Sequence, residues 1–212
     1  RDNMGEKMIL IATSNASKVR EMERAFEGLP VRLVPLSRLH EVLPDVGEIE
    51  EPVEDGVTFL ENARIKAHYY REKTGLAAFA DDSGLSVDVL DGAPGVYSAR
   101  YAGVHGDDAA NNAKVLAGLE DVADDARTAR FACALVFIDE DGTRTDAMGF
   151  IKGRIGHELR GSEGFGYDPL FLPDAFGQKK TLAEVGQDEK NAISHRGNAL
   201  RALKAKLQTG LQ

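Results

Sequence analysis

Two neighbouring carboxylates, Asp81 and Asp82, directly follow a short apolar run at residues 76–80. The run is too short for an independent helix and predicts a buried strand. Carboxylates at the mouth of such a strand suit a hard metal cation or the activation of a water molecule. If the backbone stays extended, the two side chains point to opposite faces and only one serves a given site. The alternative is a turn over residues 81–84 in which Asp81 caps backbone N–H groups.

A second polar segment, residues 13–18, joins an apolar run at residues 8–12 to a helical pattern at residues 18–27. A strand-to-helix turn presents backbone N–H groups to an anion, and the hydroxyl and amide side chains here add donors. The helix dipole opposes Lys18, whereas a bound phosphate would reverse that effect. The segment therefore indicates a phosphate site or an ordinary capped helix with Lys18 in solvent. It lacks the glycine–lysine pattern of a P-loop.

Three charged or amide side chains, Glu54, Asn62 and Lys66, bracket the start of a predicted helix over residues 58–73. Asn62 and Lys66 are four residues apart and share one helical face. Phosphoryl chemistry needs a hard cation held by carboxylates and a base for the attacking water. By itself, however, this pattern is more typical of a solvated helix face.

Two later segments combine small residues, aromatic rings and charges. In residues 164–169, glycines allow close approach to a flat ligand, and Phe165 offers a face for stacking on a base. The last predicted helix opens with His195 and Arg196, which oppose the dipole and offer donors to an oxygen-rich ligand, with Lys190 just upstream. Taken alone, each segment is better explained by a packed turn or a structural helix start.

Strands and helices alternate along the chain, an order typical of α/β folds. The capping-box spacing from Thr58 to Glu61 marks the start of one helix, and Gly75 marks its end. An Asp–Gly turn at residues 141–142 between two apolar runs predicts a hairpin. Strands are expected at residues 8–12, 31–34, 76–80, 85–90, 130–139 and 143–149, further helices at residues 107–119 and 194–208, and a loop at residues 43–55.

Composition narrows the class of protein. The chain has 212 residues, 42% of them hydrophobic, with 26 Lys+Arg against 35 Asp+Glu and a net charge of −9, which argues against general nucleic-acid binding. One cysteine, Cys133, lies in an apolar run, so no disulfide framework forms within one chain, as in a reducing cytosol. No apolar stretch spans a bilayer. Residues 1–7 are polar, lack the core of a signal peptide, and are expected to be a disordered or expression-derived tail.

Together these segments resemble the house-cleaning purine nucleoside triphosphate pyrophosphatases of the inosine/xanthosine triphosphate type. The matching segments occur in family order and span nearly the whole chain: residues 13–18, 58–66, 80–85, 92–100, 164–169 and 194–197. The family turn usually reads Thr-Gly-Asn-x-Gly-Lys, whereas Ser14 and Ser17 replace its glycines here.

The resemblance implies an α/β fold with an elongated mixed β-sheet and helices on both faces. It implies a single domain over residues 1–212, with two lobes flanking a central active-site cleft. The implied activity is Mg²⁺-dependent hydrolysis of ITP, dITP and XTP to the monophosphate and pyrophosphate, which clears deaminated purines from the nucleotide pool. The implied partners are purine nucleoside triphosphates and a second copy in a homodimer, with no nucleic acid and no membrane, and the implied location is the cytoplasm.

By motif position, the resemblance implies that Asp82 is the catalytic base and that Glu54 and Asp82 hold Mg²⁺. Asp81, facing the other way, is expected to shape the turn that holds Asp82. The implied substrate-binding residues contact the triphosphate or the base: Thr13, Ser14, Asn15, Ala16, Ser17, Lys18, Lys66, Ser83, Phe165, Gly166, Tyr167, Asp168, Lys190, His195 and Arg196.

Two rival functions fit parts of this pattern. A related pyrophosphatase acting on modified pyrimidine triphosphates would share the phosphate chemistry. A non-catalytic nucleotide sensor could keep Lys18 and Phe165 but would not need Glu54 and Asp82 as well. The presence of both carboxylates favours an enzyme.

Overall fold

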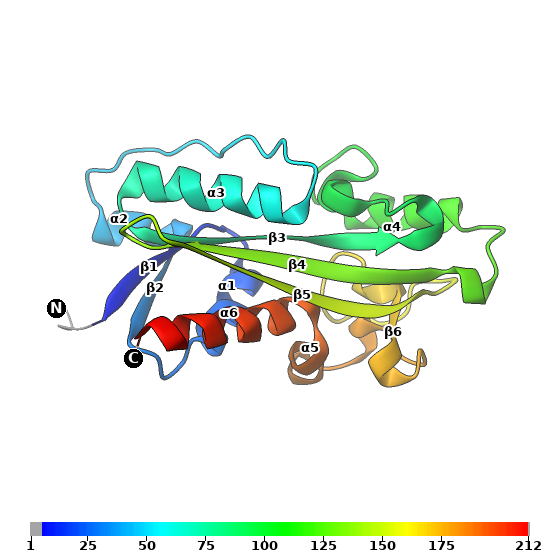
Figure 1. Ribbon diagram of the computed structural model, residues 1–212. Helices are drawn as coiled ribbons and strands as arrows, with labels where there is room; N and C mark the ends of the chain where they lie inside the picture. The colour runs from blue at the N-terminus through cyan, green and yellow to red at the C-terminus, as the bar shows by residue number, and fades with distance from the viewer. Residues whose placement is uncertain (1–5, 212) are drawn as a thin grey trace. The chain divides into compact units, whose positions relative to one another are not determined.

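The computed structural model describes residues 6–211 and shows a six-stranded mixed sheet flanked by helices (Figure 1). The sheet order is β2-β1-β3-β4-β5-β6, where β1 is parallel to β2 and β3, and β5 is antiparallel to β6. This confirms the α/β prediction. The strands are β1 Lys7–Ile11, β2 Val31–Pro35, β3 Ala77–Val87, β4 Thr128–Ile138, β5 Arg144–Ile155 and β6 Phe171–Pro173. The α-helices are α1 Ala16–Ala25, α2 Leu39–Val42, α3 Phe59–Thr74, α4 Asp108–Gly118, α5 Gln187–Ile193 and α6 His195–Leu211.

The chain divides into two compact units. Unit 1 contains the described residues up to Asp82, Ala134–Met148, and the end of α6 from Ala199. Unit 2 contains Ser83–Cys133 and Gly149–Asn198. Strands β3, β4 and β5 each contribute residues to both units. No helix in the described part of the chain is long and apolar enough to cross a bilayer.

Most of the expected N-terminal tail lies outside the described residues. Lys7, however, is the first residue of β1 and is in register with Val31 of β2, so its assignment to the tail was wrong. The cause is tertiary, because the Lys7 ammonium also pairs with the Asp139 carboxylate at the end of the β4 hairpin strand.

In unit 1, helices cover both faces of the sheet, with α3 on one face and α1 and the end of α6 on the other (Figure 1). On the α3 face, Ala78 and Ala80 of β3 pack in one buried cluster with Ala63 and Ala67. Methyl side chains on both elements permit a close helix–sheet approach. On the opposite face, the Phe79 ring packs against Phe26, with 5.7 Å between their centroids. The alternation of β3 side chains therefore continues up to the acidic pair.

Helix α3 begins and ends where its sequence predicts. The Thr58 hydroxyl accepts a hydrogen bond from the Glu61 backbone N–H, and Gly75 closes the helix in the left-handed conformation, with φ +73°. The Glu61 carboxylate accepts from the Val57 N–H, one residue before the predicted capping-box partner. These caps set the position at which Asn62 and Lys66 leave the helix.

Arg127 ties the core of unit 2 together through backbone carbonyls. This fully buried guanidinium donates to the carbonyl oxygens of Leu119, Val122, Ile155 and Gly156 at 2.6–3.1 Å. The end of α4 is thereby joined to the end of β5. A charged donor that satisfies several buried acceptors contributes more than a neutral hydrogen bond.

Replacing Arg127 should destabilise the protein strongly. Arg127→Met leaves these carbonyls without their donor, and we expect a loss of about 3 kcal/mol in the free energy of unfolding. Urea unfolding measures this loss, provided that the m-value is the same in the variant and the unsubstituted protein. The matched control is Arg130→Met, three residues further along in β4. Arg130 is exposed and its guanidinium lies 5.4 Å from the Phe150 ring centroid, so the expected change is within about 0.5 kcal/mol. Equal effects of the two substitutions would contradict the role given to Arg127.

Candidate active site

The acidic pair lies inside strand β3, not in a turn. Because β3 runs without a break from Ala77 to Val87, the turn expected at residues 81–84 and the role of Asp81 in shaping it were wrong. The separate strand expected at residues 85–90 was also wrong, since Asp88–Leu90 forms a 3-10 helix. The extended backbone sends the two carboxylates to opposite faces. Asp81 meets Lys18 of α1, and Asp82 meets Asn62 of α3.

Asp82 is a partly buried carboxylate whose acidity is strongly perturbed. Its Oδ2 atom accepts a hydrogen bond of 3.1 Å from Asn62 Nδ2. Desolvation raises the pKa of Asp82 to about 6, a shift that the Lys66 charge opposes and the Asp81 charge reinforces. A carboxyl group that titrates near neutrality, with a cation and an amide donor in place, is suited to accept a proton.

Lys66 lies among three carboxylates. Its Nζ atom is 3.2 Å from Glu54 Oε1. Burial alone would lower the pKa of Lys66, but the charges of Asp81, Glu54 and Asp82 outweigh that effect and raise it. Lys66 is therefore an ammonium ion at neutral pH, and the structure brings together the predicted Glu54, Lys66 and Asp82. The missed member of this group is Asn62, whose signal was its i, i+4 spacing to Lys66.

The strand-to-helix turn is a capped helix start with an ion pair. The Asn15 side-chain oxygen accepts from the N–H groups of Ser17 and Lys18. Contrary to the expectation from the sequence, these two donors are therefore not available to an anion. The Lys18 ammonium lies 3.0 Å from the buried Asp81 carboxylate. Asp81 thus supplies a negative charge beside Lys18 in the absence of a phosphate. Thr13 accepts from the Asn15 N–H, while Ser14 and Ala16 are exposed.

The carboxylates of unit 1 fit a magnesium ion held partly by substrate. Among the described residues, no group of three or more His, Cys, Asp or Glu side chains is arranged to hold a metal. Mg²⁺ is commonly bound by one or two carboxylates together with water and substrate phosphates. Glu54 and Asp82 both lie beside Lys66 and carry the hard oxygen ligands that this ion prefers. The donor set is thus compatible with Mg²⁺ bound together with a triphosphate.

A second group of predicted residues gathers around Phe165 in unit 2. Phe165 is 39% exposed, and the side-chain cations of Lys190 and Arg196 lie 4.6 and 5.7 Å from the centroid of its ring. Both cations are themselves buried. An exposed aromatic face beside guanidinium and ammonium donors can stack on a flat ring and bind oxygen atoms at its edge.

Asp168 anchors this group. Its Oδ2 atom accepts from Lys190 Nζ at 2.7 Å and from the Phe165 backbone N–H at 3.1 Å. Burial raises the pKa of Asp168, and the Lys190 ammonium opposes that shift. A Cβ atom at Gly164 would lie 2.2 Å from the same carboxylate oxygen, so only glycine fits there. The acid therefore orders the glycine-rich segment from within.

The other predicted residues of unit 2 are mostly buried. Tyr167 donates its hydroxyl proton to the Ser98 carbonyl at 2.6 Å, and burial raises the pKa of Tyr167. The His195 ring stacks on Phe131, with 4.9 Å between centroids and 15° between planes. Ser83 lies half-buried in β3. His195 and Tyr167 thus have packing roles besides any contact with a ligand.

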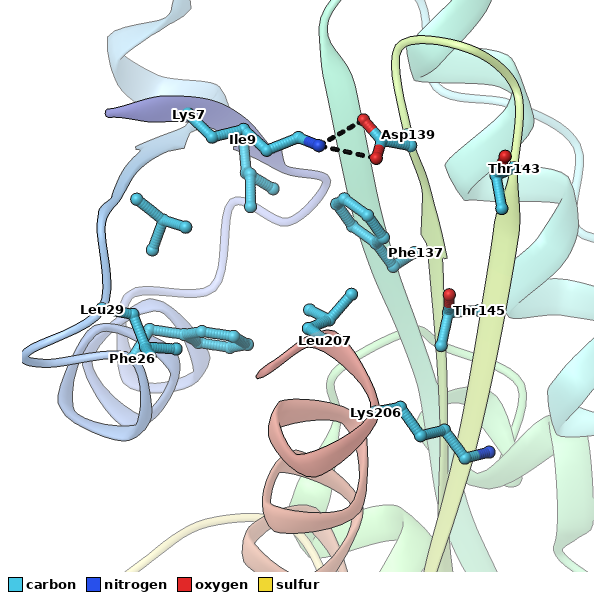
Figure 2. Close-up of a pocket in the computed structure, with 11 residues that line it drawn as sticks. Lys7, Ile9, Phe26, Leu29, Phe137, Asp139, Thr143, Thr145, Lys206 and Leu207 are labelled. Carbon is cyan, nitrogen blue, oxygen red and sulfur yellow. Dashed lines mark hydrogen bonds and ion pairs between the residues drawn. The ribbon is translucent and has the colours of Figure 1, made fainter. Parts of the chain in front are cut away.

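Unit 1 also has a pocket that contains none of the predicted site residues. Figure 2 shows Lys7 bound to both oxygens of Asp139 at its rim, above apolar side chains that include Phe26 and Leu207. Its volume of about 170 Å³ is below the range usual for ligand sites. The pocket is therefore not a candidate for a nucleotide.

The fold of this chain is that of known proteins. The chain belongs to the Ham1 family, whose model matches residues 9–206. A dITP/XTP pyrophosphatase of Streptomyces coelicolor is 49% identical over 197 residues, covering 92% of this chain and 94% of that protein. One of Listeria monocytogenes is 47% identical over 199 residues and covers 94% of each. A HAM1 protein structure from Coxiella burnetii is 41% identical, with a TM-score of 0.83, and covers 96% of this chain and 99% of that one.

Proposed function

We propose that this protein is a hydrolase that converts ITP, dITP and XTP to the nucleoside monophosphate and pyrophosphate. The observation that carries the proposal is the unit 1 group, in which Asp82, with a pKa of about 6, lies with Glu54 beside the Lys66 ammonium. The names of the Streptomyces and Listeria relatives support dITP and XTP as substrates. This activity would remove deaminated purines from the nucleotide pool.

The unit 1 residues have complementary parts in this reaction. Asp82 accepts the proton of the water that attacks the α-phosphorus. Lys66 and Lys18 neutralise the charge that grows on the departing pyrophosphate, which lowers the transition-state energy more than that of the bound substrate. The Asn15 amide nitrogen and the hydroxyls of the same turn donate to phosphate oxygens. Asn62 holds the Asp82 carboxylate in place through its 3.1 Å hydrogen bond.

Mg²⁺ is the proposed cofactor, with Glu54 and Asp82 as its protein ligands. When bound, the ion would act as a Lewis acid that polarises the phosphate oxygens. Its carboxylate ligands must be ionised, so binding of the ion would compete with protonation of Asp82. Support comes from the two carboxylates beside Lys66 and from the resemblance of residues 80–85 to the family motif.

The unit 2 residues are proposed to recognise the base. Hypoxanthine and xanthine carry a 6-oxo acceptor where adenine carries an amino donor. Lys190, His195 and Arg196 can supply donors to the base edge, with Phe165 stacked on its face and Asp168 holding Lys190. A site of donors leaves groups unpaired against adenine, a mismatch that can discriminate by orders of magnitude.

A homodimer in the cytoplasm is proposed on the family resemblance. The single cysteine, Cys133, is buried and cannot form a disulfide within one chain. An enzyme of this composition needs no oxidising compartment, because no disulfide contributes to its stability.

The activity is tested by pyrophosphate release from dITP, XTP, dGTP, dATP, dTTP and dUTP, each with and without Mg²⁺. We expect turnover of dITP and XTP that stops on chelation with EDTA and returns when Mg²⁺ is restored. Preferential turnover of dUTP or dTTP would favour the pyrimidine alternative. Stoichiometric binding of ITP without pyrophosphate release over hours would favour the sensor.

A further inference from the structure

We propose that Asp108 and Asn112 of α4 are positioning residues for the nucleobase, because they fix the backbone at Gly166 and thereby the ring of Phe165. This inference rests on the proposed function, in which Phe165 stacks on the base. Asp108 and Asn112 lie outside the motifs that carry the family resemblance.

Both polar groups of the Gly166 backbone bind to α4. The Gly166 N–H donates to Asp108 Oδ2 at 3.0 Å, and the Gly166 carbonyl accepts from Asn112 Nδ2 at 3.0 Å. Asp108 and Asn112 are four residues apart, so one helical face presents both side chains. A side chain at either position alone would hold the segment at one point, whereas the pair also sets its orientation.

The rest of this segment is held by Asp168, which lies within the segment itself. The Phe165 N–H donates to Asp168 Oδ2 at 3.1 Å, and the Asp168 N–H donates to the Phe165 carbonyl at 3.2 Å. Gly166 itself has φ +62°, a conformation that glycine adopts without strain. A glycine in a loop is otherwise a mobile point. The contacts from α4 therefore restrict the backbone next to Phe165 where it would be most flexible.

The environment of Asn112 argues for this specific role. The side chain is 4% exposed, and its Oδ1 atom is buried without a hydrogen-bond partner among the described residues. Burying an amide oxygen in this way is unfavourable, and an apolar side chain of similar size would avoid it. An amide at this position is explained by its nitrogen, because the Nδ2 donor satisfies the Gly166 carbonyl and an apolar side chain would not.

The consequence concerns the free energy of base binding. Phe165 is exposed and lies beside the Lys190 and Arg196 cations. If the ring is held before the ligand arrives, less conformational entropy is lost when the base stacks on it. Loosening Gly166 should therefore weaken binding of the base while leaving the triphosphate contacts of unit 1 unchanged.

The test compares a ligand that has a base with one that lacks it. For Asn112→Leu we expect the KM for dITP to rise about tenfold, the change that 1.4 kcal/mol produces, with kcat within about twofold. The inhibition constant of inorganic tripolyphosphate should stay within about twofold, because that probe has no base. Asp108→Ala should raise KM about threefold, and Asp108→Asn should restore it, because the amide oxygen still accepts from Gly166.

The matched control is Asn111→Ala on the same helix. Asn111 is equally buried, but it bonds the Ala102 N–H and the Ala99 carbonyl instead of Gly166. Asn111→Ala should lower the Tm without changing the ratio of the KM for dITP to the inhibition constant of tripolyphosphate. An unchanged KM in Asn112→Leu and Asp108→Ala, or a parallel rise in KM and the tripolyphosphate constant, would overturn the inference.

A second readout does not depend on activity. Hydrogen exchange at the Gly166 amide should accelerate at least about tenfold in Asp108→Ala, which removes its acceptor, but not in Asn111→Ala. Equal exchange in the two variants would also overturn the inference. Absence of dITP hydrolysis by the unsubstituted protein would instead overturn the proposed function, so the two failures are distinguishable.

Discussion

Asp82→Asn is expected to lower kcat for dITP by at least about a thousandfold while the protein stays folded. The substitution removes the proton acceptor and one of the two proposed magnesium ligands, and loss of such a group acts mainly on the transition state. The Asn62 amide can still bond the side-chain oxygen of the new residue. Pyrophosphate release under saturating dITP and Mg²⁺ measures the effect.

The same substitution should stabilise the protein above pH 6. The pKa of Asp82 is raised from 3.8 in the unfolded chain to about 6 in the folded one, so the folded state binds the proton more tightly. The stability from protonated Asp82 is complete below pH 4 and is lost as the pH rises through about 6. At pH 7.5, without metal, the ionised group costs about 2 to 3 kcal/mol, and the neutral amide avoids that cost.

Catalysis should follow the opposite limb of that titration. At subsaturating Mg²⁺, kcat/KM should fall about tenfold per pH unit below pH 6, because the protonated acid neither accepts a proton nor binds metal. The control is Asp88→Asn, an exposed acid directly after β3 and six residues beyond Asp82. Full activity of Asp82→Asn, or an equal loss in Asp88→Asn, would remove Asp82 from the mechanism.

Lys190→Met is expected to give the largest loss of stability, about 3 to 5 kcal/mol. It breaks the 2.7 Å pair with Asp168, in which the two side chains are only 4% and 6% exposed. The apolar replacement leaves the carboxylate buried without its counter-charge, and such single removals are costly. Urea unfolding at pH 7.5 measures the loss.

Two further measurements separate the ion pair from general packing. Because the pKa of Asp168 is already raised by burial, loss of Lys190 should raise it further, so the variant should regain stability as the pH falls from 8 to 5. The double variant Lys190→Met, Asp168→Leu removes both charges and should recover much of the lost stability. Equal unfolding free energies for the single and double variants would contradict the buried-charge explanation.

Local sequence patterns predicted several elements closely. Helix α3 was expected at residues 58–73 and observed at Phe59–Thr74, because its Thr58 cap and Gly75 terminus act within one turn. The β4–β5 hairpin was predicted by an Asp–Gly turn between two apolar runs, and its strands are Thr128–Ile138 and Arg144–Ile155. In both cases the determining interactions join residues that are close together in the sequence.

The acidic pair shows where local patterns are insufficient. An Asp-Asp-Ser-Gly segment is typical of a turn, yet β3 continues through it. Helices on opposite faces explain the difference: Lys18 from α1 pairs with Asp81, and Asn62 from α3 binds Asp82. Contacts with residues 20 to 63 positions away thereby compensate for burying carboxylates in a strand.

The sequence by itself determined the α/β class, the order of the family motifs and the residue types able to bind phosphate, metal and base. Only the tertiary structure decided how those residues are partnered. It assigned Asp81 to Lys18, placed Asp82 and Glu54 around Lys66, and showed α4 holding Gly166 beside Phe165. The physical reason is that charge pairing and desolvation depend on distance in space, which a one-dimensional pattern does not contain.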